Sequence, residues 1–241
     1  MLTAAVLIIV TLGVACVWQR RILWGHPEAR AITSAIILMP MGVVLIFPAQ
    51  EHYLGTWLHA LTGVWYLNDY LSLLTLMIAV NYLVKFTALI SPQITDEQAR
   101  WEMRQVSRPS IVAALVMLWA LASTKVARQP TWPGPIMDLP DGALWGMWGT
   151  YAVVQIWCLF FLLQLLRTLC KTAEHKEPLY WFMACAVTGI ATECIVIIAQ
   201  YTNSLFALRW YGTMTAILFA LIGGLRSWRK PRSRPLNGEE A

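Results

Sequence analysis

Long apolar stretches separated by short polar ones run along most of the sequence. A transmembrane helix needs about 20 mostly apolar residues to cross about 30 Å of hydrocarbon. By this measure the pattern predicts seven spans, at about residues 2–18, 31–49, 66–90, 109–127, 143–170, 179–200 and 205–225. We therefore expect an all-α, polytopic membrane protein. Its transmembrane domain covers residues 1–225, and a basic, disordered cytoplasmic tail covers residues 226–241.

The segment before the third span is less regular. Residues 53–90 are apolar almost throughout, but Asn68 and Asp69 interrupt them. These side chains would be costly deep in lipid, so we place them at the membrane surface, where they cap the third span. Residues 52–65 then form a short interfacial helix, and a hairpin that re-enters the membrane is the alternative. The apolar side of this helix consists of Tyr53, Trp57, Leu58, Leu61 and Trp65.

The basic residues sort to one side of this arrangement. Lys and Arg accumulate in cytoplasmic loops of membrane proteins. With seven spans, all but three of the 18 basic residues lie on one side, and the exceptions are Lys125, Arg128 and Arg209. We therefore predict a multi-pass protein of the cell (plasma) membrane, with the N-terminus outside and the C-terminus in the cytoplasm.

Composition agrees with a membrane protein. The chain is 58% apolar and 13% charged, whereas globular domains are about 45–50% apolar and about 25% charged. The mean hydropathy is +0.57. These values exclude a disordered chain, a collagen and a disulfide-rich secreted scaffold. The net charge of +5 reflects the topology and does not indicate nucleic-acid binding.

The connection after the third span carries a basic stripe. Thr95-Asp96-Glu97-Gln98 has the pattern of a capping box, which predicts a cytoplasmic helix over Asp96–Ser107. Arg100, Arg104 and Arg108 recur every four residues and share one face of this helix. We expect the stripe to rest on anionic lipid headgroups, with about 1 kcal/mol from each residue. Docking of an acidic cytoplasmic protein partner is the alternative.

One acidic residue lies deep in a predicted span. Glu193 shares a helical stripe with Gly189 and Cys185, so we expect it to face a neighbouring helix. Its candidate partners are Arg209 and Lys125, at the outer ends of other spans. A structural ion pair or a hydrogen-bonded carboxyl is one interpretation. A proton- or cation-coupled role is the other, because ionisable groups within spans are costly.

Two amides lie at a similar depth in the third and fifth spans, Asn81 and Gln155. They are placed to bond across helices or to line a polar pathway. Together with Glu193 and Arg209 they form the candidate intramembrane polar site.

Small residues predict close helix packing near the end of the chain. The last span carries a four-residue repeat of small side chains: Gly212, Ala216, Ala220 and Gly224. We expect the fifth, sixth and seventh spans to pack tightly against one another or against a second copy of the chain. Pro40 lies midway along the second span and is expected to kink it.

Known catalytic motifs are absent from the sequence. It contains no HExxH, no GxSxG, no Walker loop and no GxGxxG. The last span has no lysine for a retinal Schiff base. We therefore expect no enzymatic activity, no metal site and no cofactor.

The layout resembles a known group of membrane proteins. The first span ends in Gln19-Arg20-Arg21, a surface stretch runs from Tyr53-Leu54-Gly55 to Trp65–Asp69, and Glu177-Pro178-Leu179 opens the sixth span. These features resemble uncharacterised actinobacterial and phage- or prophage-carried seven-helix proteins, which are often labelled as transporters. Such relatives usually continue into a C-terminal cytoplasmic domain, which we expect this chain to lack. The resemblance implies no functional residues.

Two functions follow from these features. We expect a non-enzymatic membrane module that senses or recruits, because the inner face is basic and catalytic motifs are absent. A small-solute or ion transporter or channel that uses Glu193 is the alternative.

Overall fold

The apolar stretches form α-helices in the computed structural model, which describes residues 2–21, 24–46, 51–124, 142–199 and 206–227. No strand occurs in these residues. The elements are α1 (Leu2–Arg20), α2 (Pro27–Leu45), the π-helical turn η2 (Glu51–Gly55), α3 (Thr56–Thr62), α4 (Leu67–Ile90), α5 (Asp96–Ser123), α6 (Gly142–Thr172), α7 (Glu177–Ala199) and α8 (Phe206–Arg226). Lys125, Arg128 and the predicted tail beyond residue 227 lie outside the described residues.

Within the described ranges, six helices are long and apolar enough to cross a membrane: α2, α4, α5, α6, α7 and α8. The apolar part of α1, Ala4–Arg20, is shorter. Large apolar side chains on these helices face outward, as at Val14, Leu115 and Trp119, which is 72% exposed. A water-soluble fold rarely exposes so much contiguous apolar surface, whereas lipid accepts it. The chain is therefore an all-helical membrane protein.

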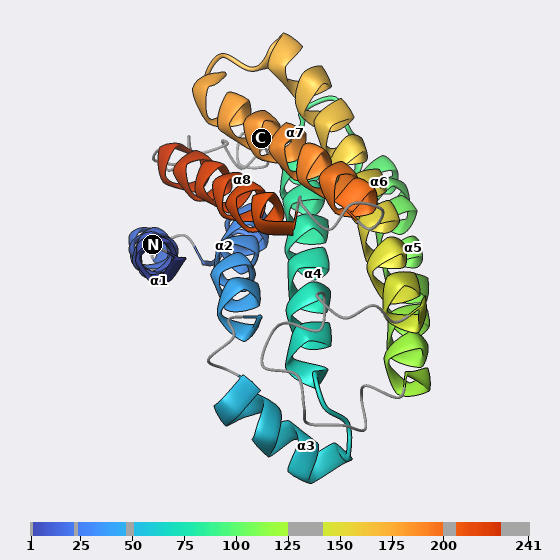
Figure 1. Cartoon of the computed structure of the whole chain (residues 1–241). Helices are drawn as coiled ribbons and strands as arrows, with labels where there is room; N and C mark the ends of the chain where they lie inside the picture. Colours follow the sequence, from blue (N-terminus) through green and yellow to red (C-terminus); the bar gives the residue numbers. More distant parts are fainter. Residues whose placement is uncertain (1, 22–23, 47–50, 125–141, 200–205, 228–241) are drawn as a thin grey trace, which may run out of the picture.

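α4 stands in the middle of the bundle (Figure 1), in contact with α2, α5 and α6. α7 packs on both α6 and α8, which confirms the predicted packing of the last three apolar segments. α8 also touches α1 and α2. α1 is seen almost end-on in Figure 1, whereas α4 and α5 run along the plane of the picture.

Glycines allow the closest helix contacts, and the small-residue repeat of α8 serves two neighbours. A Cβ added at Gly212 would collide with Thr192 of α7, and one at Gly224 would lie 2.5 Å from Ile36 of α2. α2 stays helical through Pro40, where a Cβ at Gly13 of α1 would lie 2.9 Å from the proline ring. The repeat therefore packs α8 closely against both α7 and α2.

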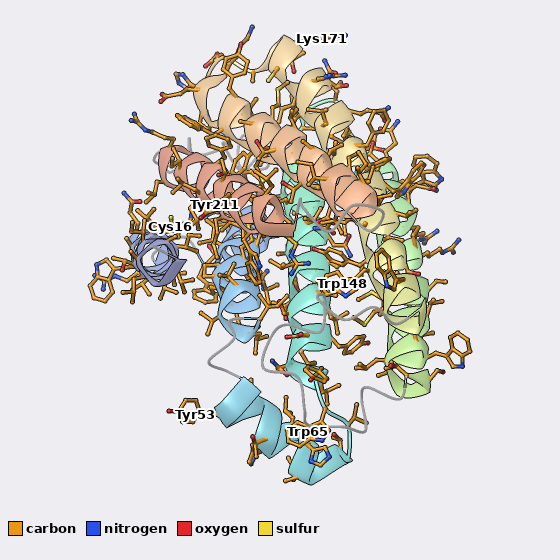
Figure 2. All side chains as sticks on the ribbon, in the orientation of Figure 1. Cys16, Tyr53, Trp65, Trp148, Lys171 and Tyr211 are labelled. Atoms are coloured by element: carbon orange, nitrogen blue, oxygen red, sulfur yellow. The ribbon has the colours of Figure 1, made fainter. Side chains whose placement is uncertain are left out.

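The short helix before α4 is confirmed. η2 and α3 cover residues 51–62, and no residue of α3 is buried. Tyr53, Trp57 and Leu61 are all exposed, and Figure 2 shows Tyr53 pointing away from the bundle. An exposed aromatic face beside the helix ends is typical of a segment that lies in the membrane interface.

The expected capping role of Asn68 and Asp69 is wrong, although α4 begins beside them as expected. The N-cap of α4 is Tyr66, without a side-chain cap, and Asn68 and Asp69 are buried against protein in the first turn, 1% and 3% exposed. Asn68 Nδ2 donates to the carbonyl of Leu45 at 3.3 Å and to Asp69 Oδ1 at 3.2 Å. Because the last carbonyls of a helix lack intrahelical partners, a buried amide at this position fastens α4 to the end of α2.

α5 is longer than predicted, because the cytoplasmic helix and the span form one helix through Pro109. The capping box is confirmed: Thr95 Oγ1 accepts from Gln98 N at 3.3 Å, and Gln98 Oε1 accepts from Thr95 N at 3.0 Å. A proline inside a helix removes the donor for the carbonyl four residues earlier. That carbonyl, of Gln105, accepts instead from Trp157 Nε1 of α6 at 3.2 Å. A contact between two helices thus replaces the missing bond.

Candidate functional site

Glu193 of α7 lies inside the bundle, 8% exposed. It lines a cavity together with Cys185 and Gly189, which precede it by two turns and one turn. The expectation that these three residues share a face toward a neighbouring helix is therefore confirmed. A Cβ added at Gly189 would lie 2.7 Å from Leu159, so α6 is that neighbour.

Arg209 lies near the start of α8 and is 4% exposed. It lines a second cavity, which Glu193 also lines. Arg209 is the positive charge that acts on the Glu193 carboxylate. Of the two partners that the sequence suggested, the structure places Arg209 beside Glu193. Burial of either charge alone would cost several kcal/mol, so their proximity accounts for both being buried.

Gln155 of α6 completes the site. Its side chain lines the first cavity with Glu193, and its buried Oε1 has no hydrogen-bond partner among the described residues. Trp148 of α6 lines the second cavity, and its buried Nε1 likewise has no hydrogen-bond partner among the described residues. A free acceptor and a free donor therefore flank Glu193, which suits a small polar guest.

The two cavities are small. Their volumes are about 40 Å³ and about 50 Å³, and Tyr151 and Glu193 line both. A buried water needs about 10–15 Å³ of such space. The site can therefore hold waters, a proton on Glu193 or one small cation, but no organic substrate.

Asn81 does not belong to this site. Its Nδ2 donates to Ser110 Oγ of α5 at 3.1 Å. Ser110 Oγ in turn donates to the carbonyl of Val106 at 2.8 Å and lies 3.8 Å from Cys158 Sγ of α6. These contacts join α4, α5 and α6. Of the four residues predicted as a polar site, the structure brings together Glu193, Gln155 and Arg209.

The basic stripe of α5 lies on the protein surface. Arg100, Arg104 and Arg108 are all exposed. Beyond Arg108 the same face of the helix becomes apolar and stays exposed, at Val112, Leu115 and Trp119. One helix face therefore changes from cationic to lipid-like within one turn. That change is expected where a helix leaves the headgroup layer and enters hydrocarbon.

Arg20 is a buried charge that the sequence analysis names only as part of Gln19-Arg20-Arg21, with no site role. It ends α1 and is 4% exposed. Its Nη2 donates to the carbonyl of Gly224 at 2.7 Å and to Ser227 Oγ, at the end of α8. The only sequence signal was an arginine after an apolar stretch, which indicates topology. The partner lies 204 positions away, and no local pattern predicts it.

Among the described residues, no group of three or more His, Cys, Asp or Glu could hold a metal ion. Comparison with known protein families, with curated proteins and with solved structures finds no match.

Proposed function

We propose that the chain is a seven-span protein of the plasma membrane, with α1 as the additional span, the N-terminus outside and the C-terminus in the cytoplasm. The contact between Arg20 and Gly224 supports this topology, because it brings the ends of α1 and α8 to the same side of the bundle. An odd number of crossings follows if every helix from α1 to α8 except α3 spans the membrane.

We propose further that the protein is a non-enzymatic module that senses or recruits at the inner membrane surface. The observation that carries this proposal is the exposed face of α5. Arg100, Arg104 and Arg108 are exposed on it, directly before the lipid-facing apolar residues. The stripe first engages anionic headgroups, and the same three charges attract an acidic protein that approaches along the membrane.

In-membrane crosslinking of the full chain in host cells, followed by mass spectrometry, tests this function. The test variant changes Arg100, Arg104 and Arg108 to Gln. The matched control changes Arg167, Lys171 and Lys176 to Gln. These three residues are also exposed, and they lie in the last turns of α6 or just after it. We expect a stoichiometric cytoplasmic partner that the test variant loses and the control keeps. Only self-crosslinks and lipid adducts in the wild type would contradict the recruiting role.

A second candidate is proton or cation transfer past Glu193. It is favoured by the two cavities around Glu193 and by the free Oε1 of Gln155. Liposomes that contain the purified protein should then show ion flux, which Glu193→Gln abolishes while Glu97→Gln, an exposed acid on α5, leaves it unchanged. Equal flux in liposomes with and without protein would rule this candidate out.

A further inference from the structure

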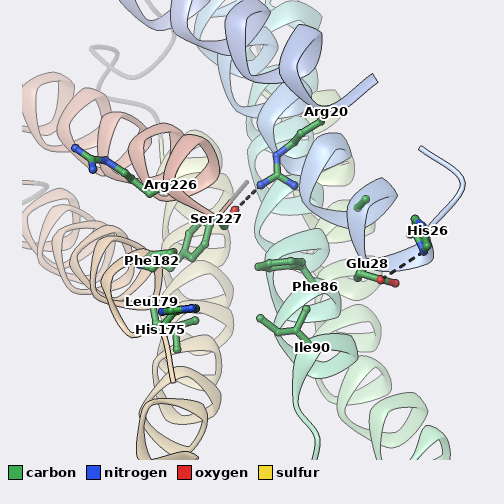
Figure 3. Close-up of a pocket in the computed structure, with 12 residues that line it drawn as sticks. Arg20, His26, Glu28, Phe86, Ile90, His175, Leu179, Phe182, Arg226 and Ser227 are labelled. Atoms are coloured by element: carbon green, nitrogen blue, oxygen red, sulfur yellow. Dashed lines mark hydrogen bonds and ion pairs between the residues drawn. The ribbon is translucent and has the colours of Figure 1, made fainter. Parts of the chain in front are cut away.

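A larger pocket lies at the other end of the bundle, where helix ends meet (Figure 3). Its volume is about 290 Å³. Residues from the ends of α1, α4 and α8 and from the beginnings of α2 and α7 line it. This is the end that carries most of the basic residues, at the membrane surface predicted to face the cytoplasm. Pockets of this size, about 300 Å³, hold small ligands or part of a larger one.

Arg20 provides the charge of this pocket. Figure 3 shows its guanidinium directed toward the side of the pocket where Phe86 and Phe182 lie, with one nitrogen bonded to Ser227. Nε of Arg20 is buried and has no hydrogen-bond partner among the described residues. A buried guanidinium with an unused N–H is a strong site for an oxyanion, because Arg donors match carboxylate and phosphate geometry.

The walls of the pocket are apolar. Phe86 and Phe182 stand edge to face, with ring centroids 5.9 Å apart. Ile90 and Leu179 extend this surface, and the mouth is formed by exposed residues that include His26 and His175. A ligand bound here would place an anionic group at Arg20 and a hydrocarbon part against the two rings.

The other charged groups do not compete for Arg20. Of the described lining residues one is acidic, Glu28, and its carboxylate lies 3.9 Å from His26 Nδ1. Arg226 is directed away from Arg20 in Figure 3 and pairs with Glu177 at 3.3 Å. The beginnings of α2 and α7 present the positive ends of two helix dipoles, and the ends of α1, α4 and α8 present the negative ends of three. The attraction for an anion in this pocket therefore comes from the Arg20 guanidinium itself.

We propose that this pocket binds an anionic amphiphile, an oxyanion attached to an apolar chain, with the oxyanion on Arg20 and the chain against Phe86 and Phe182. An anionic phospholipid and a fatty acid both supply this chemistry. The pocket is separate from the stripe of α5 and from Glu193, so the proposal does not depend on either function proposed above.

Native mass spectrometry of the full chain in detergent tests this binding. The protein is incubated with equal amounts of phosphatidylglycerol and phosphatidylcholine, and in separate samples with oleate and with inorganic phosphate. Arg20→Gln removes the charge, and Ala29→Phe fills the pocket while it keeps Arg20. Arg21→Gln is the matched control, because Arg21 is exposed, stacks on Trp18 at 3.7 Å and does not line this pocket.

We expect the wild type to retain phosphatidylglycerol in preference to phosphatidylcholine. Arg20→Gln should weaken retention about tenfold, the effect of losing one charge-assisted contact. Ala29→Phe should abolish it, and Arg21→Gln should change it by less than about twofold. Displacement by oleate would identify a fatty acid as a ligand of the same site. Equal retention of the two phospholipids, unchanged retention in Ala29→Phe, or displacement by inorganic phosphate alone would overturn the proposal. If Arg20→Gln does not fold, Ala29→Phe decides.

Discussion

A buried arginine lies at each end of α8: Arg209, within the helix, and Arg20 of α1, which contacts its last turn. The bundle stabilises these two charges in different ways. Arg209 lies in the first turns of α8, and each arginine is 4% exposed. The positive end of a helix dipole repels a cation, whereas the free carbonyls at the other end attract one. Arg209 therefore needs the acid Glu193 nearby, while Arg20 bonds directly to the carbonyl of Gly224.

This difference separates a charge-paired region from a fastening one. The Glu193 end holds two opposite charges, on α7 and α8, beside two small cavities, and each buried charge depends on the other. The Arg20 contact joins the two ends of the chain, so any change there loosens α1. Each prediction below breaks or sharpens this contrast.

Removal of Arg209 should have the largest effect. Arg209→Leu leaves Glu193 as an uncompensated buried acid, and we expect it to lower the free energy of unfolding by about 3–5 kcal/mol. Addition of Glu193→Gln to the same chain should restore more than half of this loss. Unfolding of the purified protein in mixed micelles measures both values. A double variant no more stable than Arg209→Leu would show that the two charges do not compensate each other.

Removal of the Arg20 charge should cost less, because its partners are neutral and the helix keeps its other bonds. For Arg20→Gln we expect a loss of about 2 kcal/mol, the contribution of hydrogen bonds to a charged group. Arg21→Gln should lie within about 0.5 kcal/mol of the wild type, as is usual for exposed residues. The same micelle titration compares them. Equal losses at Arg20 and Arg21 would mean that the contact with α8 contributes nothing.

The smallest effect is expected for a polar pair that lies in neither region. A double-mutant cycle with Asn81→Ala and Ser110→Ala should give a coupling energy of about 0.6 kcal/mol, typical of hydrogen bonds between membrane helices. Unfolding free energies of the two single variants and of the double variant provide it. A coupling as large as that between Glu193 and Arg209 would remove the distinction between a charged site and an ordinary interhelical bond.

Residues close together in the sequence were predicted well. The capping box at Thr95 and Gln98 and the common face of Arg100, Arg104 and Arg108 depend only on helical geometry, and the structure has them. Arg209 was one of the two candidate partners of Glu193, and the structure places it there, since α7 and α8 are consecutive helices. Residues 16 positions apart in such a hairpin have few other neighbours to choose from.

Asn68 and Pro109 show why other expectations were wrong. Asn68 was expected to cap the third span, but its side chain instead donates a hydrogen bond to the carbonyl of Leu45, which makes its burial tolerable. The cytoplasmic helix was expected to end at Ser107 and the span to begin at residue 109, but one helix continues through Pro109, where Trp157 satisfies the freed carbonyl of Gln105. In both places the compensating group comes from another helix, which no local pattern contains.

The sequence by itself determined the helical membrane architecture, because the length and apolarity of each stretch are local properties. Lipid offers the backbone no hydrogen bonds, so an apolar stretch of this length must form a helix. It also determined the candidate acid and the basic stripe. Only the tertiary structure decided which polar groups meet. The separation of Asn81 from Glu193, the contact of Arg20 with the end of α8 and the pocket beside it depend on how the helices cross. Crossing geometry arises from the close packing of many side chains together, and no single stretch of sequence encodes it.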